Sequence, residues 1–210
     1  MDPLTTALAA LLDPDGHSRA ADLLALLVDP RSLAQLAPEE LVATRLVSPA
    51  EAGRIAAAFA LVNHALEPDA TAALDRPARV ARLVPELRWS RYEELWVVAV
   101  DTRLRPLARE RVAIGSSDRC AVSAPALLRR ALLAGAAGLF MLHNHPSGDP
   151  APSQLDRRFT ADVARRAAEL DLVLHDHLVV AGLRWASCTR DASGSLLEKA
   201  PEPRDERGAA

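Results

Sequence analysis

The residues best suited to chemistry lie in one short stretch of this chain, HNHPSGDPAPSQLD, at positions 143–156. Side chains alternate along a strand, so His143 and His145 point to the same side of the strand that the preceding apolar run predicts. Pro146 then ends this strand and leaves both imidazoles at its exposed end. Asp156 follows in the first turn of the next predicted helix, which the Gly/Pro-rich turn can fold back over the strand. Two imidazoles and a carboxylate are therefore expected to meet.

This set of side chains favours a metal site. Neutral histidine nitrogen and carboxylate oxygen are usual zinc ligands, and three protein ligands with one open position suit a catalytic zinc. Each part also has an ordinary explanation, because Ser153 and Asp156 make a normal helix start and strand histidines can be hydrogen-bonded core residues. The order of strand, proline stop, turn and helix cap is expected to bring all of these side chains together at the end of the strand, and this convergence favours metal binding.

The spacing His-x-His-Pro-x6-Ser-x2-Asp resembles the signature of the MPN+/JAMM metalloproteases. HNHPSGDPAPSQLD is similar to the bacterial RadC-like branch of that family in particular. PELRWSRYEELWVVAVD, AGLFMLHNHPSG and LHDHLVVAG also follow in the family's order. The resemblance covers about residues 78–190. It implies an α/β (α+β) fold, with a mixed β-sheet of the MPN/JAMM (cytidine-deaminase-like) type flanked by helices.

The resemblance also implies a role for each motif residue. His143, His145 and Asp156 would be the ligands of one Zn²⁺ per chain. Ser153 would hydrogen-bond the tetrahedral intermediate. The family further needs an upstream glutamate as general base, at the start of the first long strand.

Two adjacent acids, Glu93 and Glu94, compete for the role of general base. Counting back from Asp101, Glu93 takes the family's position and Glu94 takes a variable one. Neighbouring side chains on a strand point to opposite faces, so only one of the two can face the metal. Glu93 is the expected base. The alternative is that Glu93 is a solvated charge at a strand end.

The implied function is zinc-dependent hydrolysis of a peptide or isopeptide bond in a peptide or protein substrate. Metal-activated water would attack the carbonyl, with Glu93 as its base. Two other functions stay open. One is a DNA repair or recombination accessory protein or metal-dependent nuclease, and the other is a metal-binding scaffold without turnover. Nothing in the sequence identifies the substrate.

The chain divides into three predicted parts. Residues 1–70 form a small helical unit, in which Ser48 caps a long helix. Residues 75–192 form the metalloenzyme domain, which is expected to begin with a helix over 78–87. Residues 193–210 form a charged, Pro-containing tail that is predicted to be disordered.

The helical unit resembles a degenerate helix-hairpin-helix module of the kind that binds DNA in RadC-like chains. Such a hairpin needs a Gly-x-Gly turn so that backbone N–H groups reach phosphate, but the turn here is RLVSPAE. The whole chain is not basic either, with Lys+Arg 25 against Asp+Glu 28. DNA is therefore a disfavoured partner, and packing or homo-oligomerisation is an equally good role for this unit.

A second histidine pair, His175 and His177, is expected on one face of a buried strand. Without a third ligand nearby, a hydrogen-bonded core histidine is favoured there over a second metal site. The resemblance suggests that Asp176 and His177 support the metal site from behind. Cys120 has no base near it in sequence, so a nucleophilic role is not supported.

The remaining sequence features indicate the cellular compartment in which the protein is expected. Two cysteines, far apart and without CxxC spacing, argue against a disulfide framework or a zinc ribbon. The N-terminus has no basic leader, and no apolar window reaches the length of a membrane span. A cytoplasmic protein with no membrane partner is expected.

Overall fold

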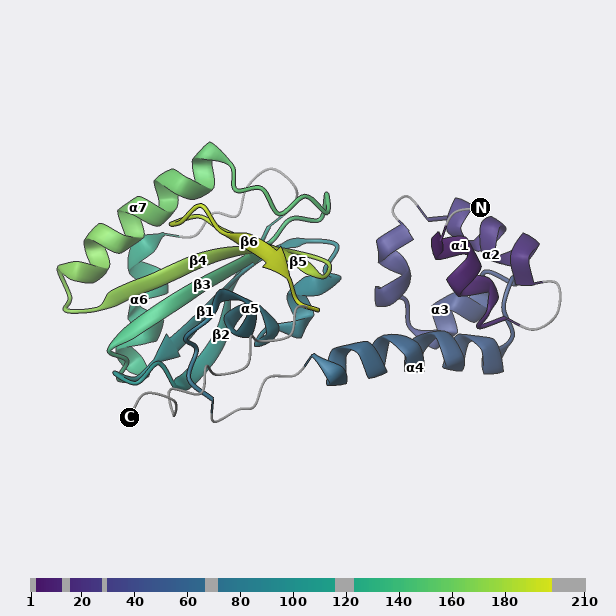
Figure 1. Cartoon of the computed structure of the whole chain (residues 1–210), viewed down its shortest axis with the longest axis horizontal. Helices are drawn as coiled ribbons and strands as arrows, with labels where there is room; N and C mark the ends of the chain where they lie inside the picture. Colours follow the sequence, from purple (N-terminus) through teal and green to yellow (C-terminus); the bar gives the residue numbers. More distant parts are fainter. Residues whose placement is uncertain (1–2, 13–15, 28–29, 67–71, 116–122, 198–210) are drawn as a thin grey trace, which may run out of the picture.

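The aliphatic runs in the second half of the chain form a six-stranded mixed sheet in the computed structural model (Figure 1). The structure describes residues 3–12, 16–27, 30–66, 72–115 and 123–197. The strand order is β2-β1-β3-β4-β5-β6, in which β3 and β4 are parallel and the other neighbours antiparallel. The strands are β1 (Glu93–Val100), β2 (Pro106–Gly115), β3 (Gly138–Asn144), β4 (Val173–Ala181), β5 (Arg184–Ser187) and β6 (Ser193–Ser195).

Helices cover both faces of this sheet, because its central strands are apolar on both sides. On one face, two helices pack against a group that includes Val97 and Met141. On the other face, a helix and a 3-10 helix pack against a group that includes Val98 and Leu142. The first face carries α6 (Ala124–Leu133) and α7 (Gln154–Ala168), and the second carries α5 (Pro77–Arg82) and η2 (Pro85–Arg88).

The first part of the chain forms helices with a core of their own, which gather to one side of the sheet in Figure 1. Leu23, Leu41 and Ile55 come from three different helices and are buried together in this core. Ser48 caps the last helix as predicted, since its Oγ accepts from Glu51 N and its N donates to Glu51 Oε2 at 2.7 Å. The elements are α1 (Pro3–Ala9), α2 (Gly16–Ala25), η1 (Pro30–Gln35), α3 (Pro38–Ala43) and α4 (Pro49–Ala65).

The predicted fold class, a mixed sheet flanked by helices and preceded by a small helical unit, is confirmed. The boundary between residues 1–70 and 75–192 stays a prediction, because residues 67–71 lie outside the described part of the chain. None of the helices in the described ranges combines the length and apolarity needed to cross a bilayer.

The helix expected over residues 78–87 is shorter in the structure. It ends at Arg82, and a 3-10 helix begins at Pro85. A proline carries no N–H for the helix ladder and disfavours helical backbone in the residue before it. Val84, with φ −119° and ψ 75°, has the non-helical backbone that this rule requires.

The predicted tail begins too early. Residues 193–195 form β6, which pairs antiparallel with β5. The Leu196 side chain that follows is fully buried in the core on the α5 face, and its N donates to Leu183 O at 2.7 Å. Burial of this leucine keeps the chain on the sheet beyond the predicted end of the domain. Residues 198–210 and Cys120 lie outside the described part of the chain.

A matched pair of leucines on α6 tests the packing of the α6–α7 face. Leu127 is fully buried, whereas Leu133 is 74% exposed. We expect Leu127→Ala to lower the free energy of unfolding by about 2–5 kcal/mol, because it leaves a cavity in the core. Leu133→Ala should change it by less than about 0.5 kcal/mol. Urea denaturation measures both, and equal effects would contradict the assigned packing.

Candidate metal centre

The motif residues come from the end of β3 and the start of α7. His143 is the last residue but one of β3, His145 follows just after the strand, and Asp156 is the third residue of α7. Ser153 caps that helix: its Oγ accepts from Asp156 N at 3.1 Å, and its N donates to Asp156 Oδ2 at 2.7 Å. This capping box orients the carboxylate beside the histidines.

The loop between β3 and α7 is shaped by its own hydrogen bonds. Gly148 has φ 80°, a left-handed conformation that residues with a side chain rarely adopt. Its N donates to His145 O at 3.0 Å, and its O accepts from Arg184 Nη2 at 2.6 Å. Asp149 Oδ1 accepts from Ala151 N at 3.1 Å. The loop thus turns back, and α7 begins beside the end of β3.

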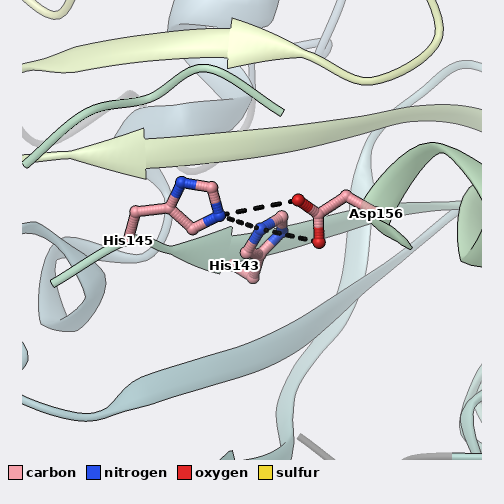
Figure 2. Close-up of side chains that lie close together, drawn as sticks. All are labelled: His143, His145 and Asp156. Carbon is pink, nitrogen blue, oxygen red and sulfur yellow. Dashed lines mark hydrogen bonds and ion pairs between the residues drawn. The ribbon is translucent and has the colours of Figure 1, made fainter. Parts of the chain in front are cut away.

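The three predicted ligands converge (Figure 2). His143 Nε2 and His145 Nε2 lie 3.0 Å apart. His143 Nε2 lies 3.4 Å from Asp156 Oδ1, and His145 Nε2 lies 3.6 Å from Asp156 Oδ2. In a tetrahedral zinc site with Zn–N distances of about 2.0–2.1 Å, ligand atoms are about 3.3 Å apart. The observed separations fit such an ion.

The tautomer of His143 follows from a buried chain of hydrogen bonds. Thr160 Oγ1 donates to Asp156 O at 2.6 Å, so it accepts from His177 Nδ1, also at 2.6 Å. Burial, followed by the effect of His143, holds the pKa of His177 well below its usual range, so His177 is neutral and its Nε2 accepts. His143 Nδ1, 2.8 Å away, is therefore the donor. The lone pair of neutral His143 is left on Nε2, which faces the cluster.

His145 has the same arrangement. Its Nδ1 lies 2.9 Å from Asp149 O, and a carbonyl oxygen can only accept, so Nδ1 carries the proton. When His145 is neutral, its Nε2 is an acceptor that faces His143 Nε2 and Asp156. Three acceptors then point at one another with no hydrogen between them. A cation, or a proton on one imidazole, is required to hold them together.

Burial and charge set the ionisation of the three side chains. The exposed position expected for His143 is wrong: it is 2% exposed, between β1 and β4, and burial lowers its pKa to about 4. The pKa of His145 is raised, first by its hydrogen bond with Asp156. Burial raises the pKa of Asp156, but hydrogen bonds with His145 and Ser153 outweigh it and hold that pKa well below its usual range. In the metal-free protein His145 is thus the first of the imidazoles to accept a proton.

Glu93 lies at the start of β1, within electrostatic reach of the cluster. Partial burial raises the pKa of its carboxyl, while His145 lowers it and Asp156 raises it. Glu93 lies two residues before Leu95, which pairs with His143, so strand alternation places its side chain on the face of the sheet that carries the cluster. Its role as general base stays a prediction.

Glu94 has a different environment. It is 7% exposed, and its carboxylate accepts from Ser90 Oγ at 2.7 Å and from Trp96 Nε1 at 3.0 Å. It also forms an ion pair with Arg111 at 3.4 Å. With these partners, the Glu94 side chain links the start of β1 to Ser90, Trp96 and Arg111. This is in line with the expectation that the side chains of Glu93 and Glu94 point to opposite faces.

The predicted arrangement of the second histidine pair is wrong. A register shift between β3 and β4 pairs Leu139 with Leu174 and Phe140 with Asp176, so His175 is the extra residue of a bulge. His175 stacks on Phe140 at 5.2 Å, on the α5 face. His177 points to the opposite face, where it contacts His143. Only His177 of the pair contacts the cluster, as predicted. The Asp176 carboxylate, predicted to support the site as well, instead accepts from Ser187 Oγ and Thr189 Oγ1 and pairs with Arg190.

Two residues of this site were missed from the sequence. Asn144 Oδ1 accepts from Glu94 N at 2.8 Å, and its Nδ2 donates to Tyr92 O at 2.9 Å, so it joins the end of β3 to the start of β1. A buried amide within an apolar strand was the available signal. Thr160 lies one helical turn after Asp156, on the same face of α7, and this spacing was its signal.

Cys188 is buried near the cluster. Burial, followed by the Asp156 charge, raises the pKa of its thiol to about 12. A thiol with so high a pKa is not a nucleophile at neutral pH. The other cysteine, Cys120, lies outside the described residues.

Comparison with known proteins agrees with this arrangement. Residues 74–193 match the family described as RadC-like JAB domain. A UPF0758 protein of Desulforudis audaxviator is 32% identical over 160 residues, which are 75% of this chain and 70% of the relative. One of Salinibacter ruber is 35% identical over 159 residues, 74% of this chain and 68% of the relative. One of Xanthomonas campestris is 36% identical over 137 residues, which are 64% of this chain and 61% of the relative.

The family match covers more than half of the chain and includes both ligand-bearing elements, β3 and α7. It confirms the RadC-like resemblance that the motif predicted. The chain belongs to the RadC-like JAB domain family.

Proposed function

We propose that this protein is a zinc-dependent hydrolase of the JAMM type that cleaves a peptide or isopeptide bond. The observation that carries the proposal is the convergence of three lone pairs, on His143 Nε2, His145 Nε2 and the Asp156 carboxylate, at separations of 3.0–3.6 Å. Three ligands from two elements leave one side of a tetrahedral ion open to water and substrate. Membership of the RadC-like JAB family supports the same chemistry.

Zinc held by these side chains would supply a Lewis acid beside the substrate carbonyl and lower the pKa of water toward ~7. Glu93 would take the proton from the attacking water and pass it to the leaving nitrogen. Its raised pKa suits both steps, because a carboxylate with a pKa nearer neutrality holds a proton more readily.

Ser153 would stabilise the oxyanion. Its Oγ accepts the Asp156 N–H at 3.1 Å, and its side chain also interacts with the Asp156 carboxylate, whose pKa it helps to lower. In the proposed reaction the Ser153 hydroxyl would turn from the Asp156 carboxylate to the substrate oxygen. Ser153 also stands at the start of α7, where the positive end of the helix dipole favours developing negative charge.

A matched pair of glutamines tests the general base. Glu93→Gln should keep its zinc but lose about 10²–10⁴-fold in kcat, because the water loses its proton acceptor. Glu94→Gln should keep most of the activity, since Glu94 faces other partners. A panel of peptide and isopeptide substrates gives the rates, and elemental analysis gives the zinc content. Full activity of Glu93→Gln would remove Glu93 from the mechanism. A zinc-loaded wild type inactive on the whole panel would favour a scaffold.

Zinc affinity should fall as the pH is lowered. Both imidazoles bind zinc only when neutral, and the raised pKa of His145 makes it the first to protonate. Asp156, with its lowered pKa, stays ionised across this range. We expect about a tenfold loss of affinity per pH unit below the His145 pKa, with a further loss near pH 4 from His143. Competition with a chelating dye measures it, and constant affinity from pH 8 to 5 would contradict the assignment.

The hydrogen-bonded chain behind His143 should also control zinc affinity. His177→Phe removes the acceptor for His143 Nδ1–H and should weaken zinc binding about 10–100-fold. His175→Phe, on the opposite face of the same strand, is the matched control and should bind as the wild type does. His177→Gln, whose amide oxygen can accept, should recover part of the loss. Unchanged affinity in His177→Phe would show that the chain does not position His143.

A further inference from the structure

A cavity of about 510 Å³ lies beside His145, between the helical unit and the sheet domain. Leu26 and Leu36 line it from the helical unit. Leu87 and Trp89 line it from η2 and the residue that follows η2. Its volume lies within the range of about 300–1,000 Å³ that is usual for ligand sites. His145 thus belongs both to the candidate metal centre and to the wall of a ligand-sized space whose lining combines leucines and a tryptophan with polar side chains such as Gln35 and Ser90.

Contacts between the two parts of the chain hold the walls of this cavity. Arg88, which is 3% exposed, donates from Nη1 to Asn63 Oδ1 at 2.8 Å. Phe59 packs edge-on against Trp89, with ring centroids 5.8 Å apart. Both Asn63 and Phe59 belong to α4. The helical unit is therefore fastened directly to the segment that forms the wall next to His145.

The charge on this wall restricts the occupant. Arg91 lines the cavity, is exposed, and has no ion-pair partner among the described residues. An exposed cation beside leucines and a tryptophan suits a ligand that combines a large apolar group with a carboxylate. A nucleic acid presents a phosphate at every nucleotide and needs many cations along its path. Residues 198–210, EKAPEPRDERGAA, contain no large apolar side chain, so this end of the chain does not match the cavity.

We propose that this cavity is the specificity pocket of the hydrolase. It takes a large aliphatic or aromatic side chain from the residue that supplies the scissile carbonyl, while Arg91 pairs with a neighbouring acidic residue. The inference rests on the proposed function, because it assumes that the carbonyl lies at the cluster of His143, His145 and Asp156. It gives the helical unit a role in recognising a polypeptide substrate, since Leu26 and Leu36 form one wall.

Hydroxamates test the pocket separately from catalysis, because a hydroxamate binds zinc without being hydrolysed. The zinc-loaded full chain is titrated calorimetrically with acetohydroxamate, acetyl-glycine hydroxamate and acetyl-leucine hydroxamate. We expect the leucine compound to bind about 10–100-fold more tightly than the glycine compound, as burial of a leucine side chain predicts. Equal affinity of the two would overturn the pocket while leaving the metal site standing. No binding of acetohydroxamate would overturn the proposed function, and this inference with it.

Two exposed leucines of the helical unit provide matched variants. Leu26 is 61% exposed and lines the cavity, whereas Leu61 is 69% exposed and does not. Leu26→Asp should reduce the leucine preference at least about tenfold, because a carboxylate then stands in the apolar wall. It should leave the affinity for acetohydroxamate unchanged. Leu61→Asp should behave as the wild type, and an equal loss in both variants would contradict a local effect in the cavity.

Arg91 is tested with acetyl-Asp-Leu and acetyl-Asn-Leu hydroxamates. The wild type should prefer the aspartate compound by about two- to fivefold at low salt, the effect of one exposed ion pair. Arg91→Gln should lose that preference and keep the preference for leucine. Equal affinities of the wild type for the two compounds would overturn the pairing of Arg91 with an acidic residue.

Discussion

The site is built around three lone pairs that converge on one point and would repel one another without a positive charge between them. His143 Nε2 and His145 Nε2 lie 3.0 Å apart, and each is close to an oxygen of Asp156. Neutral imidazoles and an ionised carboxylate cannot satisfy one another at this distance, so the site needs a positive charge at its centre. The surrounding elements keep the three side chains from separating. A buried strand carries one histidine, and a capped helix carries the aspartate.

Burial makes the orientation of these groups costly to change. A polar group in a low-dielectric core is stable only if each donor and acceptor has a partner. His143 meets this condition through His177, and His177 through Thr160. The chain ends on the carbonyl of Asp156, so the residue that supplies the carboxylate also closes the network that orients His143. Strand, helix and ligand geometry are in this way parts of one hydrogen-bonded system.

The other end of the site depends on a contact between neighbouring strands. Asn144 fastens the end of β3 to the start of β1, which brings Glu93 to the level of the histidines. The segment before β1 also meets the helical unit, through Arg88 and Trp89. The beginning of β1 is therefore the point at which the candidate base, the cluster and the first part of the chain come together. Helix α4 contacts this same short segment, through Asn63 and Phe59.

The sequence by itself determined the features that follow from local rules. Strand alternation paired His143 with His145, the cap spacing placed Asp156 at the start of a helix, and both rules involve only a few neighbouring residues. Tertiary structure decided the rest. The bulge that turns His175 away from His177, the burial of His143 and the contacts of Thr160 and Asn144 depend on register and coverage between distant segments. Register is set by packing over whole strands, which no short pattern encodes, so only the folded chain shows which polar side chains meet.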